Sequence, residues 1–410
     1  MSMQQYLQHY AENDIALSEH LQGNWQQVIC IPAFDEDQYL TNLLERLSQQ
    51  ETLLVILVLN SPDSKTDSAA EQATKEYATR LRNTLQPVQT IDAHSTLLQL
   101  NTQSSHILLL ERYGLPASEA VGLARKIACD LACQLIADKK VSSQWIHSTD
   151  ADVSLPADYF AAQPDATAAA AIYSFEHEDN PDPELNRSLR RYELGLHYYV
   201  CGLQWAGSPY AFHTIGSTLL LNAKYYALVR GFPKRAGGED FYLLNKLAKT
   251  AAISLLDSAP LILSGRSSAR APFGTGQAVN KISRLSVKHE EYTYYHPQCF
   301  VLLKQWLQLI PALENQQDYE KLIADKSLRN CLRNMGTAKA LLHAQTHSKN
   351  SAGFLRHMHN WFDAFRTLKL IHCLRDAGLN SVSLQELQSQ QDEFGFIRSA
   401  LSRRSGFNRE

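Results

Sequence analysis

The chain has 410 residues, with 39 basic and 42 acidic side chains and a formal net charge of −3. This length supports a large core and predicts more than one domain. A nearly neutral chain with a pI near 6.6 shows no electrostatic sign of nucleic-acid binding, although an average conceals local basic patches. No apolar run approaches the roughly 20 residues that cross a bilayer, and the polar first 23 residues do not resemble a signal peptide.

The number and spacing of the cysteines indicate the cellular compartment. Seven cysteines, an odd number scattered over a long chain, predict reduced thiols in the cytosol. Cys129 and Cys133 are one helical turn apart, but the apolar residues around them favour buried helix thiols over metal ligands. We therefore expect a cytoplasmic enzyme that has neither a membrane span nor a nucleic-acid partner.

In chain order, short continuous apolar runs alternate with segments of helical spacing. Such runs are typical of buried parallel strands, and the alternation predicts βαβ units and an α/β fold. The expected strands are residues 28–31, 53–59, 107–110, 145–147 and 219–221. The expected helices between them are residues 39–47, 69–85 and 118–137. Ligands of open α/β sheets bind beyond the carboxyl ends of the strands, so the functional residues should follow these runs.

The last third of the chain has a different pattern. Beyond residue 279 the strand-like runs end, and helical spacing is found in residues 300–313, 319–335, 338–347 and 354–377. We predict an N-terminal helical arm over residues 1–24, an α/β domain over 25–278 and an α-helical C-terminal region over 279–410.

Two acidic pairs stand at predicted element boundaries. Asp150-Ala151-Asp152 follows the strand at 145–147, where two carboxylates one residue apart can hold a hard divalent cation. Glu239-Asp240 opens a helix after a glycine-rich loop, where a carboxylate can act as a base in a cleft. Each pair alone is better explained as a solvated turn or as ordinary helix capping.

Together with two further motifs, these pairs resemble the GT-A nucleotide-sugar glycosyltransferases of the family-two type. The four motifs occur in the family's order within residues 25–275: Val28-Ile29-Cys30-Ile31-Pro32-Ala33-Phe34-Asp35-Glu36, Gly122-Leu123-Ala124-Arg125-Lys126, Ser148-Thr149-Asp150-Ala151-Asp152 and Gly238-Glu239-Asp240. The resemblance implies a Rossmann-like, mostly parallel sheet flanked by helices, with the C-terminal helices as an extension. It also implies a nucleotide-diphosphate sugar donor and Mg²⁺ or Mn²⁺.

The resemblance also assigns roles to residues. Asp152 would be the main metal ligand, with Asp150 beside it, and Asp240 would be the general base. Glu239 would position the acceptor, for which Gly216 and Ser217 line the site. The residues expected on the donor side are Pro32, Glu36, Asn60, Asp63, Gly122, Arg125 and Asp150.

Two further groups of residues are candidates with open alternatives. Arg266 and Arg270 lie in a Gly- and Ser-rich loop that can close over a diphosphate, or that is a surface crossover. His213 or His289 is a candidate third metal ligand, although a single histidine is more often structural. Arg125 also fits the solvated face of a helix, and the segment around Asn60 and Asp63 also fits an Asx-Pro turn.

The sequence therefore predicts a metal-dependent glycosyltransferase that inverts the anomeric centre and uses a soluble acceptor of unknown identity. A nucleotidyltransferase is one alternative, but the loop after the first strand is acidic, whereas that class usually has a glycine-rich basic loop there. A transferase-like binding protein without turnover is the other alternative, because residues 60–67 depart from the family's usual nucleoside-binding stretch. The sequence identifies neither the sugar nor the nucleotide.

Overall fold

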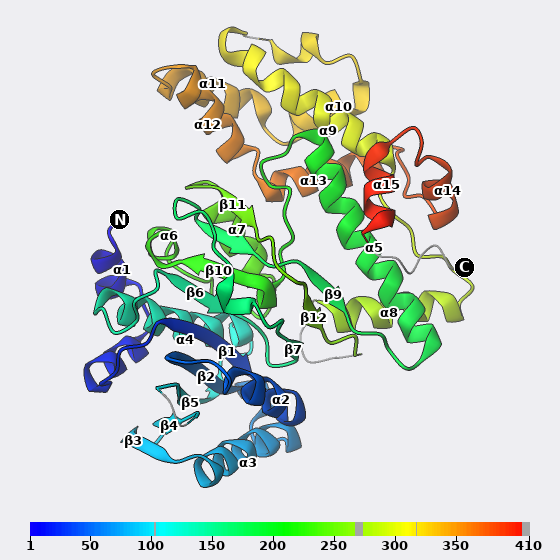
Figure 1. Ribbon diagram of the computed structural model, residues 1–410. Helices are drawn as coiled ribbons and strands as arrows, with labels where there is room; N and C mark the ends of the chain where they lie inside the picture. The colour runs from blue at the N-terminus through cyan, green and yellow to red at the C-terminus, as the bar shows by residue number, and fades with distance from the viewer. Residues whose placement is uncertain (102–103, 267–273, 317, 404–410) are drawn as a thin grey trace. The chain divides into compact units, whose positions relative to one another are not determined.

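A computed structural model describes residues 1–101, 104–266, 274–316 and 318–403 (Figure 1). The chain folds into two compact units. The sheet unit comprises Met1–Asp179 and Thr214–Gln277, and the helical unit comprises Asn180–His213 and Ala278–Glu410. The helical unit thus takes a segment from the middle of the chain, residues 180–213, in which the sequence showed no recognisable pattern.

The sheet unit is an α/β structure around a mixed nine-stranded sheet of order β11-β8-β10-β6-β1-β2-β5-β4-β3. Its strands are β1 (Gln27–Ala33), β2 (Leu53–Pro62), β3 (Pro87–Asp92), β4 (Ser95–Gln99), β5 (His106–Leu115), β6 (Trp145–Ser148), β8 (Ala170–Ile172), β10 (Leu219–Asn222) and β11 (Ile253–Leu255). The central strands β6, β1, β2 and β5 are all parallel, as the continuous apolar runs predicted. The hairpin of β3 and β4 was not predicted.

The helices of this unit connect and flank the strands. They are α1 (Met3–His9), α2 (Asp37–Leu47), α3 (Ala69–Thr84), α4 (Ala120–Ala137), α6 (Ala223–Leu228) and α7 (Glu239–Leu247). The described part of this unit also contains the 3-10 segments η1 (Asn13–His20), η2 (Asp63–Lys65), η3 (Tyr159–Ala161) and η4 (Gly216–Thr218). The predicted helices at 39–47, 69–85 and 118–137 are confirmed as α2, α3 and α4.

The antiparallel strand β10 brings a distant part of the chain to the carboxyl end of β6. Leu219, at the start of β10, is paired with Ser148, at the end of β6. Because β10 runs in the opposite direction, the η4 turn that precedes it lies at the same sheet edge as the Asp150-Ala151-Asp152 segment that follows β6.

A second, three-stranded sheet has the order β7 (Val153–Ser154), β12 (Leu261–Leu263) and β9 (Phe175–His177). Leu263 of β12 is paired with Val153 of β7 in antiparallel register. Arg266, three residues after Leu263, is thereby returned to the neighbourhood of Asp152, the residue before Val153. The sequence pattern did not predict this sheet.

A buried polar cluster attaches the N-terminal helix α1 to the sheet unit. The carboxylate of Asp130 on α4 is fully buried and accepts hydrogen bonds from the hydroxyls of Tyr6 and Tyr226 and, at 2.8 Å, from Lys126 Nζ. Lys126 Nζ also donates to the Tyr6 hydroxyl at 2.7 Å. Since buried polar groups need such partners, the cluster accounts for a helical N-terminal segment fixed against α4 and α6.

In its described part the helical unit contains no β-strand. Its helices are α5 (Pro183–Ala206), α8 (Thr275–Val287, from Ala278 onward), α9 (Pro297–Leu309), α10 (Lys326–Asn334), α11 (Thr337–His347), α12 (Ser351–Trp361), α13 (Ala364–Asp376), α14 (Leu384–Ser389) and α15 (Gly395–Ser402), with the 3-10 turns η5 (Ile310–Asn315) and η6 (Tyr319–Leu322). Aromatic side chains, among them Tyr198, Phe300, Trp306 and Phe362, are buried in its core.

Three expectations for this region need correction. The segment 319–335 is not one helix, because η6 ends at Leu322 and the Asp325 side chain caps α10 by accepting from Leu328 N at 2.7 Å. The segment 354–377 is not one helix, because Phe362 leaves the helical conformation at the end of α12 and the Asp363 side chain caps α13 by accepting from Arg366 N at 3.1 Å. The expectation of reduced thiols is wrong for two of the seven cysteines, since Cys331 and Cys373 form a disulfide between α10 and α13. The other five thiols are buried.

Candidate active site

The residues singled out in the sheet unit gather where β1, β2 and β6 end and β10 begins. Arg125, from the second turn of α4, is the centre of this group. Its side chain is 4% exposed, so it does not lie on a solvated helix face. Its guanidinium donates from Nη2 to Asp150 Oδ1, and from Nε to Glu239 Oε1 at 2.9 Å. Nη1 donates to Ser148 Oγ at 3.3 Å.

Arg125 therefore joins two acidic motifs that are 89 residues apart in the sequence (Asp150 to Glu239). Burial alone lowers the pKa of a guanidinium, but the carboxylates of Asp150, Glu239 and Asp240 outweigh it and raise the pKa of Arg125. The Arg125 guanidinium is permanently charged, so the surrounding carboxylates must remain ionised to neutralise it. We conclude that Arg125 is a positioning residue for both motifs.

Gly216 and Gly122 lie where any larger residue would clash with a neighbouring group. A Cβ on Gly216 would stand 2.7 Å from Nη2 of Arg125, so η4 packs directly on the guanidinium. A Cβ on Gly122 would stand 2.6 Å from the carbonyl oxygens of Pro233 and Arg235, and Gly122 N donates to Arg235 O at 3.0 Å. The backbone that approaches Gly122 is that of the loop before α7, where we had predicted a ligand.

Glu239 is held inside this network. It is 5% exposed and one of its oxygens accepts from Arg125. Glu239 thus belongs to the framework that fixes the start of α7. The sequence did not reveal this contact. Its neighbour Asp240 is the more accessible acid of the pair.

Asp240 has a raised pKa. Burial raises its pKa to about 7, with further elevation from the adjacent Glu239 and from Asp150, against the lowering effects of Phe241 N and Arg125. Phe241 N donates to Asp240 Oδ1 at 2.6 Å. A carboxylate whose pKa lies near neutral pH is a better proton acceptor than an ordinary one while still being substantially ionised.

Arg266 forms a second, more open ionic cluster. Its Nη2 donates to both carboxylate oxygens of Glu36 and, at 2.9 Å, to Asp152 Oδ2. The guanidinium also lies over the ring of Tyr39, 4.4 Å from the centroid, a cation–π contact that the sequence gave no reason to expect. Predicted donor-side and metal-side residues are therefore bridged by a positive group. Arg270 lies outside the described residues.

Pro32, Asn60 and Asp63, which were predicted on the donor side, lie in different surroundings. Pro32 is buried within β1, opposite Val58. Asn60 is also buried, and its amide donates to the backbone carbonyls of Ala33 and Val58 at 3.2 and 3.3 Å. Asp63 is exposed and accepts from Ala117 N at 3.0 Å, which ties η2 to the loop before α4. Asn60 therefore holds the ends of β1 and β2 together, and only Asp63 stabilises a loop.

A small cleft nevertheless opens at this edge, beyond the ends of β1 and β2. Glu36 lines it, together with Ala33, Asp35, Asp37, Leu40, Leu59, Ala73, Thr74 and Tyr77. Asp35 has a positive φ of 56° and its N–H donates to Thr74 Oγ1 at 3.1 Å. The cleft has a volume of only about 10 Å³, room for about one water molecule, so it holds no nucleobase in this structure. Thr74 and Tyr77 of α3, which line it, were absent from the sequence-based set. Their helical position alone gave no signal.

The histidines proposed as metal ligands belong to the helical unit, whereas Asp150 and Asp152 belong to the sheet unit. His213 is buried beside His197, with 5.0 Å between ring centroids. Burial, with a smaller effect of His197, lowers the pKa of His213 to about 3. His289 is exposed, in the turn after α8. Within the described residues, no group of three or more His, Cys, Asp or Glu side chains is arranged to hold a metal ion.

Comparison with known proteins gives no family for this chain. No protein-family model matches it, and no curated protein sequence is significantly similar to it. Among the described residues, no helix has the length and apolar character of a membrane span. The geometry of the two arginine clusters therefore carries the functional argument.

Proposed function

We propose that the sheet unit is a GT-A glycosyltransferase of the family-two type, which moves a sugar from a nucleotide-diphosphate donor to an acceptor hydroxyl and inverts the anomeric centre. The main support is the contact of Arg125 with both Asp150 and Glu239. It unites, at one sheet edge, the two acidic motifs on which the family resemblance depends, and it sets beside them an acid, Asp240, with a pKa near 7.

The donor set fits Mg²⁺ or Mn²⁺. Asp150 and Asp152 contact two different arginines, so a cation at Asp152 would take the place of the Arg266 guanidinium. Mg²⁺ is commonly bound by one or two carboxylates together with substrate phosphates, without a complete protein cage. Asp152, with Asp150 beside it, would hold the cation. When bound, the cation supplies charge neutralisation for the departing nucleoside diphosphate.

Arg266 would have two partners in turn. In the structure it contacts Glu36 and Asp152. With donor bound, its planar fork of N–H groups is suited to a diphosphate oxygen pair, which would release Asp152 for the cation and Glu36 for the nucleoside. The cation–π contact with Tyr39 would keep the Arg266 side chain at this edge with or without a bound donor.

Asp240 would accept the proton from the acceptor hydroxyl as the oxygen attacks the anomeric carbon. Arg125 and Glu239 hold the start of α7, so the base would approach from a fixed direction. Attack opposite to the departing diphosphate gives inversion. Gly216 and Ser217 in η4, next to Arg125, would bound the acceptor side of the same space.

The test is a panel of nucleotide sugars with Mn²⁺, in which release of nucleoside diphosphate is measured with and without candidate acceptors. We expect slow metal-dependent hydrolysis of one donor. Release of pyrophosphate from a nucleoside triphosphate would instead identify a nucleotidyltransferase, and tight donor binding without turnover would identify a binding protein.

Asp152→Asn sharpens this test, because it removes a carboxylate from the cation site and should abolish metal-dependent binding of the donor nucleotide. Asp165→Asn, in an exposed turn of the same unit, is the matched control. Calorimetric titration with nucleoside diphosphate and Mn²⁺ measures both. Equal affinities for the two variants would remove Asp152 from the metal site.

A further inference from the structure

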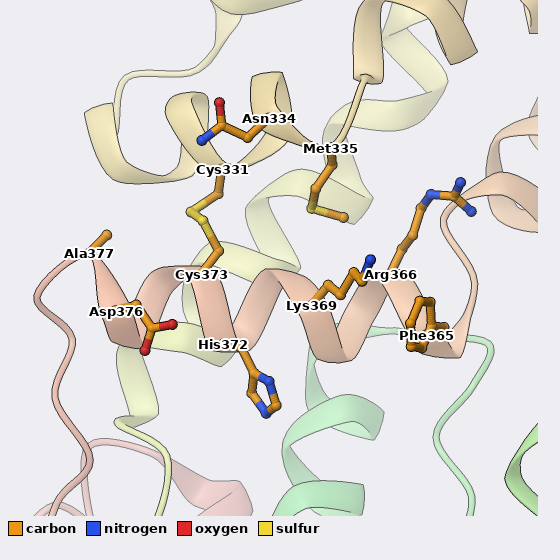
Figure 2. Close-up of a pocket in the computed structure, with 10 residues that line it drawn as sticks. All are labelled: Cys331, Asn334, Met335, Phe365, Arg366, Lys369, His372, Cys373, Asp376 and Ala377. Atoms are coloured by element: carbon orange, nitrogen blue, oxygen red, sulfur yellow. A yellow bond between two sulfur atoms is a disulfide. The ribbon is translucent and has the colours of Figure 1, made fainter.

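A cavity of about 690 Å³ lies in the helical unit between α10 and α13 (Figure 2). Its wall on α13 includes Phe365, Arg366, Lys369, His372, Cys373 and Asp376, and its wall on α10 and the following residue includes Cys331, Asn334 and Met335. None of these residues takes part in the site of the sheet unit. The cavity is large enough for a ligand of a few tens of atoms at most.

The charge of this cavity is positive. Lys369 contacts the Phe365 ring, 4.7 Å from its centroid, and forms no ion pair with a described residue. Arg366 donates from Nη1 to the neutral carbonyl oxygen of Trp361 at 2.7 Å. The one acid, Asp376, is already paired with Arg375 at 2.8 Å. Burial, with the nearby Arg375, lowers the pKa of His372, so that this side chain adds no charge at neutral pH.

The Cys331–Cys373 disulfide forms part of the same wall (Figure 2). Cys331 is 1% exposed, whereas Cys373 is only half-buried. Cys373 and Lys369 are four residues apart on α13 and hence on the same helix face. Cys373 is therefore the more accessible cysteine of the pair for a small molecule in the cavity, with a lysine ammonium one turn away.

We propose that this cavity binds low-molecular-weight thiols that carry carboxylates, and that Cys373 is their site of thiol–disulfide exchange. The ligand's thiolate attacks Sγ of Cys373 in line with the disulfide. A new S–S bond forms between ligand and Cys373, the Cys331–Cys373 bond breaks, and Cys331 leaves as a thiolate that takes a proton. A second thiol molecule then releases Cys373 as a thiol and forms the oxidised dimer of the ligand.

Charge and burial explain why this ligand class is favoured. The carboxylates of such a thiol would be attracted by Lys369 and Arg366, which raises the encounter rate at low ionic strength. Attack at Cys373 is favoured over attack at Cys331 because exchange requires access to the sulfur. Reduction would detach α10 from α13 and release a cross-link across 42 residues, which loosens the segment that contains α11 and α12.

The experiment compares three thiols with the oxidised full chain: reduced glutathione, which is anionic, 2-mercaptoethanol, which is neutral, and cysteamine, which is cationic. The rate of disulfide opening is followed by acid quenching and mass spectrometry, and each rate is divided by the thiol's thiolate concentration. We expect glutathione to react about 10-fold faster than the neutral thiol at low salt, cysteamine to be the slowest, and the first adduct to be on Cys373.

Variants test whether the charges of Lys369 and Arg366 cause the differences in rate between the thiols. Lys369→Gln and Arg366→Gln should bring the three rates together, while Lys339→Gln, on α11 and outside the cavity lining, should leave them apart. Cys331→Ser keeps Cys373 alone and should be thiolated by oxidised glutathione at that residue.

Three results would overturn the proposal: equal rates for the three thiols, a first adduct on Cys331, or seven free thiols in protein prepared under oxidising conditions. If Cys331→Ser folds and gives no adduct, the modification site is wrong as well.

Discussion

Two arginines reach the acid pair at the end of β6, and they are held in different ways. Arg125 has a side chain 4% exposed, and its partners Asp150 and Glu239 are 36% and 6% exposed. Arg266 is 25% exposed, between Glu36 at 12% and Asp152 at 24%. Removal of one partner from a buried ion pair is strongly destabilising, whereas pairs with more contact with solvent contribute less. Arg125 thus belongs to the framework, and the loss of Arg266 should cost the fold less.

Replacement of Arg125 should have the largest effect. Arg125→Met leaves the buried carboxylate of Glu239 without its cation, and we expect a loss of about 3–5 kcal/mol in the free energy of unfolding. Denaturant unfolding followed by circular dichroism measures it. Arg125→Met/Glu239→Leu, which leaves no isolated buried charge, should recover a substantial part of the loss. A loss below about 1 kcal/mol in the single variant would show that Arg125 is not the buried centre of the site.

The Asp240→Asn variant tests whether Asp240 acts as a general base. Asp240→Asn keeps the shape of the side chain but removes the proton acceptor, so turnover should fall on the order of 10²- to 10⁴-fold while donor affinity is retained. Wild-type turnover should rise with pH through an apparent pKa near 7. Near-normal turnover of the variant would remove Asp240 from the mechanism and, with it, the argument for inversion.

The stability of the same variant should depend on pH. The raised pKa of Asp240 means that folding favours its protonated form, a contribution to stability that is complete below the ordinary pKa of 3.8 and lost as pH rises through about 7. Asp240→Asn should therefore be more stable than wild type at pH 8, by roughly 1–3 kcal/mol, and similar to it at pH 4. Thermal unfolding at both pH values checks this, since a residue that only caps α7 would show no such difference.

Gly216→Ala probes the close packing on Arg125. The added Cβ would meet a guanidinium that Asp150 and Glu239 hold in place, and we expect a loss of about 1–3 kcal/mol in the free energy of unfolding. Gly395→Ala is the matched control, because a Cβ there has no atom within 4 Å. If the two variants unfold alike, η4 does not rest on Arg125.

Arg266→Gln should change stability least, by about 0–1 kcal/mol. Its effect should appear in ligand binding: affinity for Mn²⁺ alone rises because Asp152 loses its competing cation, and affinity for nucleoside diphosphate with Mn²⁺ falls. Arg333→Gln, which removes an exposed pair with Glu320, is the control in the same titrations. A weaker affinity for Mn²⁺ alone would show that the two cations do not share Asp152.

The sequence indicated the right class of fold, and several residues that meet at one sheet edge, for local reasons. Continuous apolar runs identified β1, β2, β5, β6 and β10 because strands buried on both faces need no polar alternation. The acids Asp150, Asp152 and Asp240 follow element boundaries, which are also local features. It missed β3, whose residues are mostly exposed, and with it the short buried strand β4 that pairs with it. It joined α12 and α13 because both share helical spacing across the break at Asp363.

By itself the sequence determined the order of the elements, the alternation that produces a parallel centre, and which charged residues follow strand ends. Only the tertiary structure decided which of them meet: that Arg125 is buried between Asp150 and Glu239, that Arg266 returns to Asp152 through the pairing of β7 and β12, and that Cys331 joins Cys373. These are contacts between residues far apart in the chain. Their positions depend on strand register and helix packing, because no local pattern of residue types records which distant backbone will be its neighbour.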